Sequence, residues 1–140
     1  MAIKKNERRS GVAAVELAIL LPLIALLFAI GVDWCRIFYH SVTVENCARN
    51  GALFGSSLRS YQEKAWVSPN NDITKATLAD GGTLSPPLDS SDVHVTNGTG
   101  SDGNANITVS VDYPFTTLTG FPGLSQTFTL HAQVSMRVAP

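Results

Sequence analysis

The stretch VAAVELAILLPLIALLFAIGV, residues 12–32, decides the fold of this chain. It contains one ionisable side chain, Glu16, in an otherwise almost continuous apolar run. As a helix it would be about 31 Å long at 1.5 Å per residue, which is close to the hydrocarbon thickness of a bilayer. The sequence therefore predicts a transmembrane helix over residues 12–32.

Charge is distributed unevenly on the two sides of this stretch. Residues 1–11 form a basic leader, whose four positive side chains are Lys4, Lys5, Arg8 and Arg9. The residues beyond it hold 6 basic and 10 acidic side chains, a formal charge of -4 within the overall -1. The positive-inside rule then keeps the N-terminus cytoplasmic and sends the C-terminus across the membrane. An acidic remainder has no electrostatic footprint for nucleic acid.

A cleaved secretory signal peptide has the same general form, a basic start followed by an apolar run. The apolar run here is longer than the usual signal core. It ends in IGVDWCRIFYH, residues 30–40, where bulky and charged residues replace the small residues of a signal cleavage site. We therefore expect the helix to stay attached to the residues that follow it.

Glu16 is an unfavourable residue in a membrane helix, at a cost of about 2–3 kcal/mol near the bilayer centre. In one interpretation it sits shallowly and reaches the headgroups. In the other, a peptidase cuts after Gly11 and makes Val12 the new N-terminus, whose ammonium lies about 6 Å along the helix axis from Glu16. The two charges could then pair between neighbouring chains that are displaced along the axis.

RRSGVAAVELAILLPL, residues 8–23, and GVDWCRIFYHSVTVENCARNGALFG, residues 31–55, resemble the TadE-like pseudopilins of tight-adherence (Flp, type IVc) pilus systems. The ending ITVSVDYPFTTLTGFPGLSQTFTLHAQVSMRVAP is also similar to that family. The resemblance implies a bacterial inner-membrane protein with a periplasmic C-terminal domain. It also implies that a prepilin peptidase cuts between Gly11 and Val12, which makes Glu16 the fifth residue of the mature chain.

Residues 33–60 are expected to continue the helix beyond the membrane as an amphipathic extension that ends between Gly55 and Tyr61. Gly51 and Gly55 are interpreted as a fraying helix end rather than a packing notch, and Pro22 predicts a kink within the span. Cys35 and Cys47 would stand about 18 Å apart, too far for an intrachain disulfide. The predicted inner face of the extension comprises Trp34, Ile37, Phe38, Ser41, Val44, Ala48 and Ala52, with His40 among the polar residues elsewhere.

Residues 61–91 read as a connector with a possible short helix over residues 73–79. In residues 92–140 apolar and polar residues alternate, which predicts antiparallel strands with one buried face. PFTTLTGFPGLSQ, residues 114–126, is expected to join the last two strands. The predicted class is α+β, with the long helix packed on a small antiparallel sheet. The alternating apolar residues are Val93, Val95, Ile107, Val109, Val111, Tyr113, Phe128, Leu130, Ala132, Val134, Met136 and Val138.

Other chemical motifs in the chain are weak. Gly98, Gly100 and Gly103 match a dinucleotide fingerprint, but a strand pattern follows them where the mechanism requires a helix. The oxygens of Asp102, Asn104 and Asn106 could hold calcium, although these residue types also suit a tight turn. The histidines show no zinc-ligand spacing and are expected at surface positions. We therefore predict no catalytic residue, no metal and no cofactor.

Two functions follow from the sequence. The first is a minor pseudopilin for a Tad/Flp pilus used in surface adhesion, whose partners are the lipid bilayer, the prepilin peptidase, and other pilins or the assembly machinery. The second is a single-pass periplasmic binding module with an uncleaved signal anchor, for which Glu16 would be incidental. In neither is the chain an enzyme.

Overall fold

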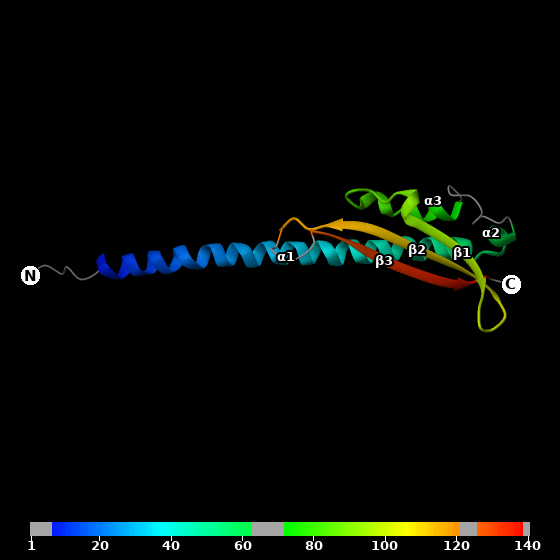
Figure 1. Ribbon diagram of the computed structural model, residues 1–140, viewed down its shortest axis with the longest axis horizontal. Helices are drawn as coiled ribbons and strands as arrows, with labels where there is room; N and C mark the ends of the chain where they lie inside the picture. The colour runs from blue at the N-terminus through cyan, green and yellow to red at the C-terminus, as the bar shows by residue number, and fades with distance from the viewer. Residues whose placement is uncertain (1–6, 63–71, 121–125, 139–140) are drawn as a thin grey trace, which may run out of the picture.

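The computed structural model of the chain describes residues 7–62, 72–120 and 126–138. Figure 1 shows a long rod, α1, with the sheet and the short helices gathered along its C-terminal half. This arrangement confirms the predicted α+β class. The elements are α1 (Glu7–Gly55), α2 (Leu58–Gln62), α3 (Asp72–Leu78), two short 3-10 turns (Gly81–Thr83 and Ser90–Asp92), β1 (Val93–Thr99), β2 (Ala105–Thr116) and β3 (Thr127–Arg137).

The three strands form one antiparallel sheet in the order β1-β2-β3. The turn between β1 and β2 uses the residue types that favour turns. Gly103 has a φ of 77°, and the Asp102 carboxylate accepts hydrogen bonds from the backbone and side-chain nitrogens of Asn104. These local bonds explain why Gly, Asp and Asn occur here.

β2 is longer than the sequence pattern predicts, because it continues through Pro114 to Thr116. A proline normally argues against a central strand, since it cannot donate a ladder hydrogen bond. Here β1 pairs with β2 only as far as Val111, so residues 112–116 have β3 alone as a neighbouring strand. Pro114 therefore lies on a locally open edge, and Phe115 joins the buried face.

The core lies between the C-terminal half of α1 and one face of the sheet. Every second residue of β2 points into it, as the alternation predicts. Small residues on α1 allow the sheet to approach the helix closely. The most buried members are Val44, Cys47, Ala48 and Ala52 of α1, Ile73 of α3, and Ile107, Val109, Val111, Tyr113 and Phe115 of β2.

Gly51 and Gly55 contribute to this close packing. A Cβ on Gly51 would collide with the hydroxyl of Thr77 in α3, and a Cβ on Gly55 would lie 3.0 Å from Ile73. α1 does end at Gly55, within the expected range. However, the interpretation of these glycines as a fraying end is wrong, because they are buried where α3 and β2 pack against the helix.

The predicted inner face of the helix extension is wrong at its N-terminal end. Trp34 and Phe38 are 55% and 63% exposed, whereas Asp33 and His40 are each only 5% exposed. Asp33 is buried because it receives hydrogen bonds from the residues after β2, and His40 because it packs on aromatic rings. Specific polar and ring contacts therefore turn the helix away from the orientation that apolar periodicity alone suggests.

Candidate functional site

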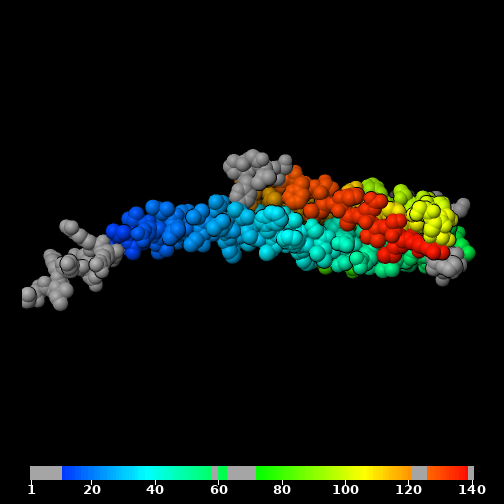
Figure 2. Space-filling model, turned by 90° about the horizontal axis from the view of Figure 1, so that it is seen from below, coloured from blue at the N-terminus to red at the C-terminus, as the bar shows by residue number. Residues whose placement is uncertain are grey.

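The N-terminal half of α1 is an uncovered apolar surface. Within the described residues, no part of its most apolar 18-residue window is buried, and Phe28 is 73% exposed. Figure 2 shows this half extending as a bare rod beyond the sheet. A helix that is apolar on all sides requires a membrane or other apolar surroundings. One long apolar N-terminal helix is consistent with a single membrane anchor.

The residues predicted to act in processing and assembly all lie on this bare half of α1. Around Gly11 there is open space, since a Cβ added there would meet nothing within 4 Å. Val12 and Glu16 are exposed, and Glu16 has no ion-pair partner among the described residues. The helix continues through Pro22 without interruption, and a kink at that position stays a prediction. Within the described part of the chain, Glu16 thus points outward without an ion-pair partner.

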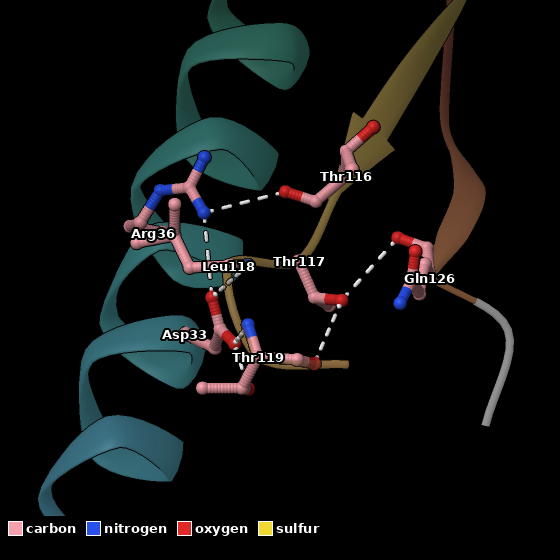
Figure 3. Close-up of polar contacts among 7 residues, drawn as sticks. All are labelled: Asp33, Arg36, Thr116, Thr117, Leu118, Thr119 and Gln126. Carbon is pink, nitrogen blue, oxygen red and sulfur yellow. Dashed lines mark hydrogen bonds and ion pairs between the residues drawn. The ribbon is translucent and has the colours of Figure 1, made fainter. Parts of the chain in front are cut away.

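A polar contact that the sequence does not reveal lies directly after the apolar half. The buried carboxylate of Asp33 accepts hydrogen bonds from the backbone nitrogens of Leu118 and Thr119, each at 2.9 Å. It also accepts one from the hydroxyl of Thr119. Figure 3 shows these groups converging on one side chain of α1. Leu118 and Thr119 are 85 and 86 positions from Asp33 in the sequence. Their hydrogen bonds therefore attach the segment after β2 to the helix.

Arg36 and Thr117 complete this contact. Arg36 Nη1 lies 3.3 Å from Asp33 Oδ1 and donates to the carbonyl of Thr116 at the same distance. Its guanidinium also sits 5.0 Å from the ring centre of Phe115. Thr117 donates its backbone N–H to the carbonyl of Gln126 at 2.9 Å, which links the segment to the residue just before β3. We call the group formed by Asp33, Arg36 and residues 117–119 the Asp33 clasp.

The Asp33 clasp favours the ionised carboxylate. The hydroxyl of Thr119 is the largest influence, and together with the backbone donors and Arg36 it outweighs burial and lowers the pKa of Asp33 from 3.8 to about 2. A carboxyl group whose pKa is lower in the folded chain than in the unfolded chain stabilises the fold at pH values above its unfolded pKa. This stabilisation, about 2 kcal/mol, is present above pH 3.8 and is lost as the pH falls towards 2.

Asp33→Asn is expected to destabilise the clasp by about 2–3 kcal/mol, because the amide nitrogen would face backbone N–H donors and the charge would be lost. We expect faster hydrogen exchange of the Leu118 and Thr119 amides in detergent-solubilised protein. Asp72→Asn is the matched control, since Asp72 pairs with Lys75 on the exposed surface and such pairs contribute little. Unchanged exchange at residues 118 and 119 in Asp33→Asn would refute the role of the clasp.

His40 and Cys47 are buried packing groups. The His40 ring stacks on Tyr113 at a centroid distance of 5.5 Å and meets Phe115 edge-on at 5.1 Å. Burial, together with the charge of Arg36, lowers the pKa of His40 and keeps the imidazole neutral. Burial likewise raises the pKa of Cys47 to about 11, which leaves an unreactive thiol. The surface position expected for His40 is therefore wrong.

The other two histidines lie on the outer face of the sheet, as expected. His131 Nδ1 is 2.6 Å from one carboxylate oxygen of Asp112, and His94 Nε2 is 3.8 Å from the other. The three come from three adjacent strands, so neither residue spacing nor sequence order indicates that they meet. Among the residues that the structure describes, no group of three or more His, Cys, Asp or Glu side chains is arranged to hold a metal ion.

Comparison with known families connects these observations. Residues 11–53 match the model of the TadE-like protein family. Residues 11–53 thus form a TadE-like segment of the chain. No curated protein and no solved structure matches it. The family match begins at Gly11, includes Val12 and Glu16, and ends inside the packed half of α1.

This TadE-like segment implies a role in Tad pilus systems and an association with the Tad pilus machinery. The family belongs to pilus assembly and is not known to be enzymatic. The match stops before α3 and the sheet, so the Asp33 clasp joins a helix inside the matched region to residues after β2 that lie outside it. That separation explains why no local motif points to the clasp.

Proposed function

We propose that this chain is a minor pseudopilin for the biogenesis of a Tad/Flp (type IVc) pilus used in surface adhesion. The observation that carries the proposal is the family match over residues 11–53, which includes the bare apolar half of α1. A pilin-type subunit needs such a surface, because its helix must first lie in lipid and then pack on the helices of other subunits. The role is one of assembly, and the chain itself catalyses no reaction.

The proposed topology is a single pass through the inner membrane. Residues 12–32 would span the bilayer, with the basic leader of residues 1–11 in the cytoplasm. Residues 33–60 would carry the helix into the periplasm, followed by the connector of residues 61–91 and the strands of residues 92–140. The Asp33 clasp would then lie at the periplasmic surface of the membrane, one residue beyond the span.

Processing would occur between Gly11 and Val12. α1 begins at Glu7, so this peptide bond lies inside the first turns of a helix. A peptidase needs a locally extended substrate, and glycine is about 1 kcal/mol less favourable in a helix than alanine. Gly11 thus makes the helix easier to unwind at this bond and presents no side chain to obstruct a peptidase site.

Glu16 would act after processing. The new ammonium of Val12 and the carboxylate of Glu16 both sit in an apolar environment, where an unpaired charge is costly. Glu16 is exposed and unpaired among the described residues, so it is available to the Val12 ammonium of a neighbouring subunit. Pairing between subunits would neutralise both charges and set the axial position of one subunit relative to the other. A bend at Pro22 would help the helices to pack side by side.

The direct test is deletion of the gene for this chain in its own strain. We expect loss of surface pili and of tight adherence, and restoration of both when the chain is supplied in trans. The alternative, a binding module with a permanent signal anchor, predicts normal pili with at most a change in what the cell binds. Normal piliation and adherence in the deletion strain would therefore contradict the proposed function.

A further inference from the structure

We propose that the segment after β2, through Leu118, is a second membrane contact of this protein and sits in the headgroup layer of the bilayer beside α1. This inference rests on the proposed function, because it requires that residues 12–32 span the membrane. The occupant of the surface is lipid, and the contact comes from a part of the chain outside the family match.

The position of Asp33 along α1 determines how deep in the bilayer Leu118 lies. The headgroup layer adds about 5–7 Å to each side of the hydrocarbon core, which at 1.5 Å per residue corresponds to about four residues after Val32. Asp33, Trp34 and Arg36 fall within that layer. The carboxylate of Asp33 holds the backbone nitrogens of Leu118 and Thr119 at 2.9 Å, so Leu118 lies at the same depth as Asp33. Figure 3 shows these residues directly beside this turn of the helix.

Exposure and chemistry identify lipid as the occupant. Leu118 is 69% exposed although its backbone is fixed by a buried carboxylate, and Trp34 is 55% exposed two residues beyond the span. Both are exposed apolar side chains at the turn of α1 that follows residues 12–32: Trp34 lies on the helix, and Leu118 is held beside it by Asp33. Tryptophan is enriched at the membrane interface, where its amphipathic ring fits the headgroup level. A leucine held at that level is covered by acyl chains rather than by water.

Attachment at two points restricts the orientation of the sheet relative to the membrane. A single helix would leave the sheet free to tilt about the point where α1 leaves the bilayer. With Leu118 also in the headgroup layer, the sheet end nearest the bare half of α1 rests on the membrane (Figure 1). Arg36 strengthens this position, since it donates to Thr116 and pairs with Asp33 at the same level. The sheet would thus stand in one orientation before the subunit leaves the bilayer.

The experiment uses the full chain in vesicles of phosphatidylethanolamine and phosphatidylglycerol. An environment-sensitive fluorophore is attached to Leu118→Cys in a Cys35→Ser background, in which the buried Cys47 stays unlabelled. Labels at Ile24→Cys and Ser101→Cys mark the span and the far turn of the sheet. We expect a blue shift and quenching by spin-labelled lipid at residues 24 and 118 but not at 101. Adding Asp33→Asn should reduce quenching at residue 118 and leave residue 24 unchanged.

Each contrary result has a distinct meaning. Quenching at residue 24 with a water-like signal at residue 118 overturns the second contact and leaves the membrane anchor intact. A blue shift at residue 118 that depends on protein density and not on spin-labelled lipid identifies a second copy of the chain as the occupant, which also overturns the inference. Absence of quenching at residue 24 contradicts the proposed span itself, and with it the contact.

Discussion

Glu16→Ala is expected to leave the protein in the membrane and to abolish pilus formation. Removing the carboxylate makes the helix more apolar, so insertion should be normal or improved. In the assembling pilus the Val12 ammonium would lose its partner, and a buried charge left unpaired costs about 3–5 kcal/mol. A loss of 3 kcal/mol weakens an association by more than about a hundredfold. The measurement is a blot of membrane fractions beside counts of surface pili in the same strain.

Two further variants make this result specific. Glu16→Gln keeps the size of the side chain and removes its charge, so it should fail like Glu16→Ala. Glu45→Ala removes an exposed glutamate from the same helix, where it lies 3.5 Å from Arg49 on the surface. It should assemble normally, since exposed pairs contribute little. Normal piliation in both Glu16 variants at normal membrane levels would show that Glu16 is only a shallow, solvated carboxylate.

Gly11→Leu is expected to block processing completely. The leucine side chain would fill the space that a small residue leaves for the peptidase, and it would also strengthen the helix across the bond to be cut. The chain should accumulate in the membrane with its basic leader attached, and pili should be absent. The measurement is the intact mass of the protein purified from cells that contain an active prepilin peptidase.

Gly31→Leu is the matched control for this effect. Gly31 lies on the same helix and, like Gly11, has nothing within 4 Å of the position of an added Cβ. Its replacement should leave processing unchanged, whatever it does to later packing. If the Gly11→Leu chain loses its basic leader to the same extent as the Gly31→Leu control, Gly11 does not define the cleavage site.

The parts of the fold that follow from sequence are those that local periodicity determines. The apolar run of residues 12–32 predicts the bare half of α1, and the alternation from Ile107 to Tyr113 predicts the buried face of β2. Pro114 misleads this reasoning, because a proline in a strand is tolerated only where one neighbouring strand is missing. That condition depends on where β1 ends, which local sequence does not specify.

Contacts between distant segments account for the remaining errors. The sheet covers the helix face that carries Asp33 and His40, since hydrogen bonds and ring stacking stabilise them there, and Trp34 is left outside. Gly51 is buried because Thr77 of α3 and Val109 of β2 pack against it. The Asp33 clasp depends on residues more than 80 positions away, so its only local sign is an acidic residue directly after an apolar run.

The most direct measurement is the N-terminal residue of the protein isolated from the membranes of its own cells. Processing as a pseudopilin predicts that the mature chain begins at Val12, with Glu16 as its fifth residue and the basic leader removed. Mass spectrometry of the N-terminal peptide identifies this end without any mutation. A chain that still carries residues 1–11 in cells with an active prepilin peptidase would contradict the pseudopilin role and favour an uncleaved membrane anchor.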